Sequence, residues 1–289
     1  MSRAEVSSTP ENSQPRRHRY HAIGAIAATL LCASTAAHAG PTIDGNITDW
    51  GLHRTGNVSD WTPSATINHY TVEDQTGNSG VFLNPGYGGQ RYDAEAIYLS
   101  WDATNLYVLI ITGLPFNNPH NPAGNSYGAG DILIDFGQNG SFEYGMAVKG
   151  YAGLTPGSVY QVGSVNYGLW SAPGVLGHPG TNPVAIKTGT QTGTGQLAYT
   201  LVGNNMGLYA ADQHYAIEAA IPILSLGAFW GNGQKFDVQW TMYCANDIIS
   251  VDPLVAPRGV PEPGVPALLA AALVAGAIPA GRRFVNRKS

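Results

Sequence analysis

The sequence predicts an all-β fold, a single β-sandwich of jelly-roll type, and three observations favour it. Several runs of about four to eight residues are rich in Ile, Val, Tyr and Phe and are bounded by Gly, Asn, Asp or Pro, as strands are. Glycine and proline are frequent, with 37 and 19 residues in a chain of 289. Between the two ends of the chain, apolar residues do not recur with a helical period beyond a short turn at 223–229. Short strands joined by Gly and Pro turns are typical of sandwiches and barrels.

The expected strands follow one another through the middle of the chain. They are Ala96–Trp101, Leu106–Thr112, Asp131–Phe136, Tyr144–Val148, Ser158–Val162, Tyr215–Ile221 and Phe236–Tyr243. The polar segments 51–92, 113–130 and 168–196 are expected to be long loops, and loops of that length often carry function.

The N-terminus has the three parts of a secretory signal peptide. Residues 1–21 are polar and basic, an apolar stretch runs from Ala22 to Leu31, and Ala37-His38-Ala39 precedes Gly40. This order predicts a signal peptide over residues 1–39, cleaved after Ala39. We therefore expect export through the general secretory route and a β-sandwich domain over residues 40–255.

The C-terminus has the composition of a membrane segment. A short Pro-rich linker is followed by an uncharged apolar run from Gly264 to Gly281. An 18-residue helix would span roughly 27 Å, barely enough for a bilayer core. The basic residues after it, expected to stop transfer and stay cytoplasmic, are Arg282, Arg283, Arg287 and Lys288.

The charge of the domain argues against nucleic-acid partners. The whole chain has 14 basic and 19 acidic residues, and 6 and 16 of these lie within residues 40–260, a net charge near −10. So acidic a domain repels phosphate backbones and suits cations or neutral glycans. Cys244 would be the one cysteine left after processing, so no disulfide within the chain is expected.

The order of parts in residues 256–289 resembles the PEP-CTERM sorting segment of exported bacterial proteins. The resemblance rests on the motif Pro261-Glu262-Pro263, the apolar run and the basic end. It implies processing by an exosortase and delivery to the cell envelope, the outer surface or the extracellular matrix. A permanent C-terminal membrane anchor is the alternative reading of the same tail.

A second resemblance covers roughly residues 42–247. It is carried by the order of Ile43-Asp44-Gly45, Asp49-Trp50, the run 94–102, the run 130–135, the run 215–222 and the closing run 240–247. Together these resemble the β-sandwich superfamily of family 9 carbohydrate-binding modules and DOMON-type domains. The resemblance implies recognition of extracellular polysaccharide without catalysis.

Calcium is the metal that the composition favours, because hard cations take carboxylate, amide and carbonyl oxygens. We expect a structural Ca²⁺ whose candidate ligands are Asp93, Glu95, Asp102, Asp131 and Asp247. Asp135 and Glu143 have similar access to such a cation site. The run Asp135–Gly140 superficially resembles a calcium loop. The alternative for each carboxylate is turn capping or solvation.

Aromatic rings flanked by polar or Gly-rich sequence are candidates for stacking on sugars. They are Trp61, Trp170, Trp230 and Tyr87, with Tyr92 and Tyr167 of the same kind. The alternative is that they pack in the interior, as expected for Trp101 and Trp240.

The sequence thus predicts an exported, non-enzymatic carbohydrate-binding protein. One alternative is a structural protein of an exopolysaccharide or biofilm matrix with no discrete ligand. Another is a polysaccharide-degrading enzyme, which would need two carboxylates facing each other across a cleft.

Overall fold

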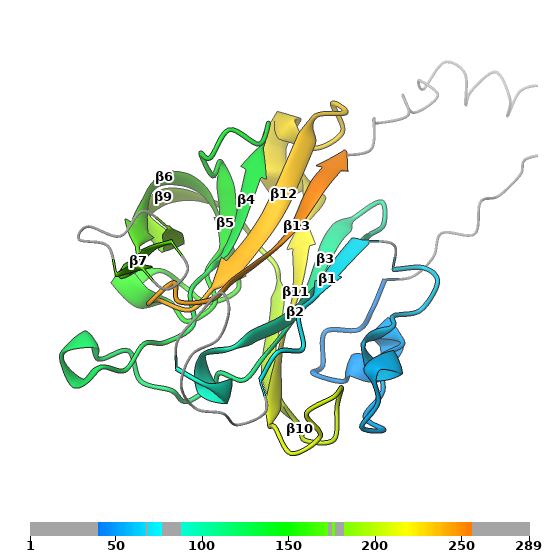
Figure 1. Cartoon of the computed structure of the whole chain (residues 1–289). Coiled ribbons are helices and arrows are strands. Elements are labelled where there is room, and N and C mark those ends of the chain that lie inside the picture. The colour runs from blue at the N-terminus through cyan, green and yellow to red at the C-terminus, as the bar shows by residue number, and fades with distance from the viewer. Residues whose placement is uncertain (1–39, 68, 77–87, 173–174, 177–181, 256–289) are drawn as a thin grey trace, which may run out of the picture. The chain divides into compact units, whose positions relative to one another are not determined.

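The computed structural model describes residues 40–67, 69–76, 88–172, 175–176 and 182–255. The predicted signal peptide, Tyr87, and the predicted linker and sorting tail with Pro261, Glu262 and Pro263 lie outside these residues. Within them, two antiparallel sheets face each other, and the fold is all-β and sandwich-like (Figure 1).

The first sheet has five strands in the order β1-β2-β3-β11-β10. These are β1 (His69–Val72), β2 (Ala94–Trp101), β3 (Asn105–Thr112), β11 (His214–Pro222) and β10 (Gln196–Gly203). The second sheet has six strands in the order β13-β12-β4-β5-β6-β9. These are β13 (Ile248–Val255), β12 (Lys235–Thr241), β4 (Ile132–Phe136), β5 (Tyr144–Met146), β6 (Ser158–Tyr167) and β9 (Pro183–Thr194).

Short elements connect the sheets. Strands β7 (Trp170–Ala172) and β8 (Val175–Leu176) form a small ribbon. The 3-10 helices are η1 (Ile47–Trp50), η2 (Val58–Trp61), η3 (Gln90–Tyr92), η4 (Pro122–Gly124), η5 (Tyr151–Gly153) and η6 (Ile223–Phe229). None of the helices in the described part of the chain is long and apolar enough to span a membrane.

The main core lies between the two sheets and follows the two-residue alternation of the strands. Ile97 and Leu99 of β2 and Ile110 of β3 meet Ile134 of β4 and Trp240 of β12 in one buried cluster. Cys244 is 95% buried beside this cluster, as expected for a small apolar residue rather than a reactive thiol.

The outer face of the first sheet is covered by the N-terminal segment. Trp50 and Trp61 pack with Tyr98 and Leu109 in a second buried cluster. The indole Nε1 of Trp50 donates to Glu218 Oε1 at 2.7 Å, which gives this buried carboxylate a partner. Trp50 therefore lies on the face of the sheet and not at its edge, because η1 folds back across the strands.

All seven expected strands are confirmed, with ends shifted by a few residues, and the turn at 223–229 is the 3-10 helix η6. The expectation of a loop over 168–196 was wrong, because β9 occupies its second half. Strand β9 forms the outer edge of the second sheet, so most of its side chains from Lys187 onward face solvent. Its threonines favour an extended backbone, but both of its faces are polar, which hides the strand period.

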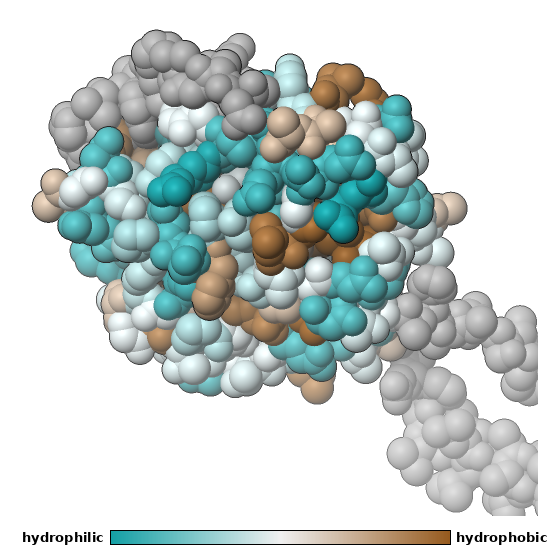
Figure 2. Space-filling view, turned by 90° about the horizontal axis from the view of Figure 1, so that it is seen from below, coloured by the Kyte–Doolittle hydropathy of each residue, from teal (hydrophilic) through white to brown (hydrophobic). Residues whose placement is uncertain are grey.

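A single residue joins β9 to β10, so one extended segment passes from the second sheet to the first. That residue is Gly195, whose N–H donates to the Gly157 carbonyl at 2.8 Å. The crossover closes one side of the sandwich. Seen from below, the domain surface shows apolar residues in small patches among hydrophilic ones (Figure 2).

Candidate functional site

A cleft of about 490 Å³ opens on the outer face of the second sheet. It is lined by the β4–β5 turn and by the middle of β6. Its floor is apolar, because Phe142 and Val162 pack on a buried cluster that contains Leu133, Tyr160 and Ile186. This face of the sheet therefore combines an apolar base with access to solvent.

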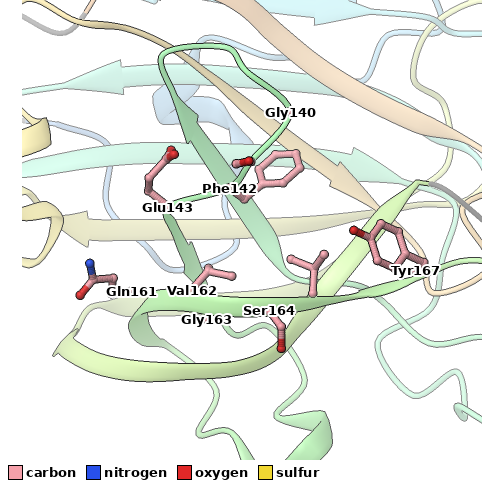
Figure 3. A pocket seen from close by; sticks show the side chains of 10 residues that line it. Gly140, Phe142, Glu143, Gln161, Val162, Gly163, Ser164 and Tyr167 are labelled. Carbon is pink, nitrogen blue, oxygen red and sulfur yellow. The ribbon is translucent and has the colours of Figure 1, made fainter.

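The rim of the cleft carries one aromatic ring and several polar groups. Tyr167, at the end of β6, is 57% exposed. Gln161 and Ser164 on the same strand are also exposed. In the close view, Tyr167 and Phe142 lie toward one end of the cleft, and Gln161 and Glu143 lie toward the other (Figure 3). Rings beside amide and hydroxyl groups are typical of sites that take small polar molecules with one apolar face.

The β4–β5 turn is shaped by a buried carboxylate. Asp135 accepts hydrogen bonds from the backbone N–H groups of Asn139 at 3.2 Å and Gly140 at 2.7 Å. Gly137, Gln138 and Gly140 have positive φ, the left-handed region that such a tight turn uses. The run 135–140 that resembles a calcium loop is thus a capped turn, which presents Phe142 and Glu143 to the cleft.

Glu143 is the one charged residue among the described residues that line the cleft. Its Oε2 accepts from the Phe136 N–H at 2.6 Å. Burial raises the pKa of this carboxyl, and the nearby charge of Asp135 raises it further, although the hydrogen bond acts in the opposite direction. Because no lysine or arginine lines the described part of the cleft, it favours neutral ligands over anionic ones.

The aromatic residues expected to bind ligand lie elsewhere. Trp61 is 97% buried, and its ring meets the His214 ring edge to face with centroids 5.6 Å apart, so it cannot stack on a sugar in this structure. Trp230 is half-buried and packs against Trp101 and Phe236. The side chain of Trp170, like Tyr87, lies outside the described residues.

Two of the five expected calcium ligands, Asp102 and Asp131, accept hydrogen bonds from backbone N–H groups. Asp102 Oδ1 accepts from the N–H groups of Thr104 at 2.6 Å and Asn105 at 2.8 Å, and so caps the β2–β3 hairpin. Asp131, 96% buried, accepts from Val148 and Ile186, each at 2.9 Å. Asp102 therefore fits the turn-capping alternative, whereas Asp131 is neither a turn cap nor solvated and instead joins the backbones at Val148 and Ile186.

The other three lie close together but have different hydrogen-bond partners. Asp93 accepts a short hydrogen bond from the Thr76 hydroxyl, while Asp247 Oδ2 accepts from the Ala94 N–H at 2.6 Å. Burial and the charges of Glu95 and Asp247 raise the pKa of Asp93 to about 10, and burial raises that of Asp247 to about 6. At neutral pH this buried pair therefore holds one proton.

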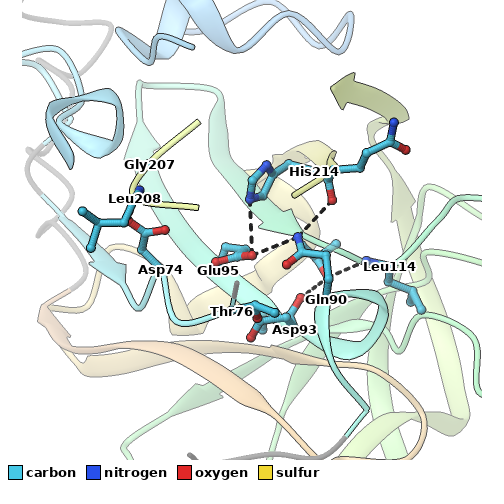
Figure 4. Close-up of polar contacts among 12 residues, drawn as sticks. Asp74, Thr76, Gln90, Asp93, Glu95, Leu114, Gly207, Leu208 and His214 are labelled. Atoms are coloured by element: carbon cyan, nitrogen blue, oxygen red, sulfur yellow. Dashed lines mark hydrogen bonds and ion pairs between the residues drawn. The ribbon is translucent and has the colours of Figure 1, made fainter. Parts of the chain in front are cut away.

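Glu95 turns to a different partner. Its Oε1 lies 3.3 Å from His214 Nε2 and accepts from Gln90 Nε2 at 3.1 Å (Figure 4). Across the residues that the structure describes, no three His, Cys, Asp or Glu side chains meet in an arrangement that would hold a metal ion. The described carboxylates therefore do not fit the expected calcium cage.

A second cleft of about 640 Å³ lies between the N-terminal segment and β10. Asp44, Arg54 and Thr200 are among the residues that line it, but no Trp, Tyr or Phe is. Its walls thus offer hydrogen bonds and charges of both signs, with the small ring of His53 as the one aromatic group among the described lining residues.

Sequence reasoning missed Phe142, Gln161 and Ser164 as cleft residues, but it noted Tyr167 as a candidate stacking ring and Glu143 as a candidate metal ligand. Gln161 and Ser164 could have been found by continuing the strand Ser158–Val162 to Tyr167, since the outward positions then become visible. Phe142 gave no such signal, because its place depends on the turn that Asp135 caps. No protein-family model matches the chain, and no curated protein matches it.

Proposed function

We propose that this chain is an exported protein of the cell surface or extracellular matrix that binds neutral polysaccharide, without catalysis, in the cleft over β6. The cleft over the second sheet carries the proposal. Its apolar floor, the exposed ring of Tyr167 and the amide of Gln161 match a sugar ring, which has an apolar face and a hydroxyl edge.

The distribution of charge supports binding over hydrolysis. Glycoside hydrolysis uses two carboxyl groups about 5–9.5 Å apart on either side of the scissile bond. Glu143 is the one carboxylate among the described residues of the cleft, and it is held by the Phe136 N–H. A polysaccharide can thus be bound there with no second carboxylate to cleave it.

Replacing Tyr167 with alanine is expected to weaken polysaccharide binding about tenfold, because a stacking ring of this kind contributes about 1.5 kcal/mol. The measurement is affinity electrophoresis of residues 40–258 through gels that contain the host's exopolysaccharide. Tyr209→Ala is the matched control, because Tyr209 is 37% exposed but lies in the β10–β11 loop. Equal retardation of wild type and Tyr167→Ala would contradict the assignment of the cleft.

The same gels, run once with calcium and once with a chelator, test whether polysaccharide binding needs calcium. We expect retardation to survive chelation, because the cleft itself offers one carboxylate. Retardation lost with the chelator would instead assign calcium a role in ordering the binding face.

A structural matrix protein without a discrete ligand is the second candidate. It is favoured by the exposed edge strand β9, whose Thr- and Gly-rich end from Lys187 to Thr194 is polar on both faces. Such a surface suits a hydrated polymer. No retardation of a folded domain in any gel would favour this candidate.

Export and sorting complete the proposal. The finer architecture would be a jelly-roll sandwich preceded by a cleaved signal peptide and followed by a PEP-CTERM tail that an exosortase removes. Deleting Pro261–Ser289 is expected to release the domain from the cell, which fractionation of cells and medium measures. Surface association that survives this deletion would contradict the role of the tail.

A further inference from the structure

The described chain begins and ends at one end of the sandwich. Val255, the last residue of β13, pairs with Lys235, the first residue of β12. Gly40 lies against the ring of Tyr107, whose hydroxyl donates to Asp102 in the β2–β3 hairpin at 2.8 Å. The segments that would enter a membrane on either side of residues 40–255 are therefore attached to the same end of the domain.

The helix η6 holds these parts together. The Ile223 N–H donates to the Thr104 carbonyl of the β2–β3 hairpin at 2.8 Å. At the other end of η6, Phe229 packs on Phe136, with ring centroids 5.5 Å apart. Trp230, the next residue, packs on Phe236 beside the start of β12. The helix thus spans the two sheets at the end from which the chain leaves.

This end also carries an apolar surface, which we call the apolar cap. Leu224 is 95% exposed, the largest exposure among the large apolar residues of the described chain. Ala228 is exposed, and Ile223, Phe229 and Trp230 are half-buried. Leucine and tryptophan side chains at a protein surface are typical of regions that enter the lipid headgroup layer.

The length of chain beyond the cap fixes its distance from the predicted membrane segment. Eight residues, 256–263, separate Val255 from the apolar run that begins at Gly264. Fully extended, they reach about 27 Å. A tail inserted in a bilayer would therefore keep this end of the domain within reach of the lipid surface.

We propose that the apolar cap rests on the lipid bilayer while the C-terminal tail is inserted, with Leu224 and Trp230 in the headgroup region. This inference rests on the membrane tail of the proposed function. It gives the domain a fixed orientation, in which η6 faces the membrane and the β10–β11 loop faces away from it.

The test uses the full chain reconstituted in phosphatidylcholine vesicles whose acyl chains are brominated near the headgroup. Bromine quenches tryptophan fluorescence at short range, so contact of the cap with lipid is expected to quench Trp230. The Trp230→Phe variant should lose most of this quenching. Leu224→Asp should lower the ratio of docked to undocked domains about tenfold. Leu208→Asp is the matched control, because Leu208 is 63% exposed in the β10–β11 loop.

Resistance to extraction by alkaline carbonate reports tail insertion separately. If the tail is inserted but neither Trp230→Phe nor Leu224→Asp changes the quenching, the cap does not rest on lipid. That result would overturn this proposal and leave the membrane tail standing. If carbonate extraction removes the wild-type chain from the vesicles, the tail is not inserted in the bilayer. That result would overturn both the membrane tail of the proposed function and this proposal. If Leu224→Asp instead splits a dimer of the chain in detergent, the cap is an interface between copies and the proposal fails.

Discussion

Raising the pH from 7 to 9 is expected to lower the free energy of unfolding by about 3 kcal/mol through the buried Asp93–Asp247 pair. The folded pair holds a proton that the unfolded chain has already released, since a free aspartate ionises near pH 4. The folded state therefore binds more protons, and its stability falls as the pH rises toward the folded-state pKa of Asp93, about 10. Thermal unfolding with a chelator present should show a melting temperature about 8 °C lower at pH 9.

The groups around the pair add to this effect. Glu73 on the segment after β1 has a pKa raised to about 8, first by burial and then by the charges of Asp247 and Glu95. His214 lies against Glu95, with 3.3 Å between Nε2 and Oε1. The described residues bring no lysine or arginine into ion-pair contact with Asp93, Asp247 or Glu73, so bound protons reduce the negative charge of these three carboxyls.

The Asp247→Asn variant isolates the contribution of the pair. Its amide oxygen can still accept from the Ala94 N–H, and its NH₂ group can donate to an ionised Asp93. The decline between pH 7 and pH 9 should shrink, because burial and the charge of Glu95 still raise the pKa of Asp93 whereas the charge of Asp247 no longer does. Asp102→Asn, in the β2–β3 turn, is the matched control and should leave the decline unchanged, because burial is outweighed by hydrogen bonds that lower the pKa of Asp102 and keep it ionised from pH 7 to pH 9. An undiminished decline in Asp247→Asn would show that Asp247 does not help Asp93 to hold its proton.

The Gly195→Ala variant is expected to destabilise the domain by about 3 kcal/mol, as overpacking in a close-packed site does. A Cβ at this crossover would lie 2.5 Å from Met146 Cε and still closer to the Ala220 carbonyl oxygen. The carbonyl belongs to a paired strand, so it cannot move away without breaking the first sheet. Urea unfolding measures the change.

Gly163→Ala is the matched control for the crossover. There the nearest atom to an added Cβ would be the Thr188 hydroxyl at 3.1 Å, the end of a side chain on the exposed edge strand. This variant should be destabilised by less than about 1 kcal/mol. Equal losses in the two variants would mean that the crossover is no tighter than an ordinary edge position.

Strands with a buried apolar face could be predicted from the sequence, whereas the edges could not. In β2 and β3, apolar residues dominate because both faces of the first sheet are covered. In β9, Thr188, Gly189 and Thr190 are all exposed, so no alternation remains to indicate a strand. Strand β13 was missed for another reason, since Asp252 and Pro253 interrupt its apolar run.

The candidate site was less predictable, because it depends on contacts distant in sequence. Asp93 and Asp247 meet only because β2 and β13 lie together at one end of the sandwich, which no local pattern encodes. Trp61 was expected at the surface because its neighbours are polar. One of them, Asp60, is itself 99% buried and accepts from the Thr55 and Gly56 N–H groups, which turns Trp61 onto the sheet.

The link between Trp50 and Glu218 sets a time order for folding. These two residues are 168 positions apart, so the N-terminal cover has no complete sheet to pack on until β11 is in place. Closing so long a loop is slow, because its entropy is lost before the contact forms. Under the export proposed above, this slow step would favour an unfolded chain, the state that a secretion channel accepts.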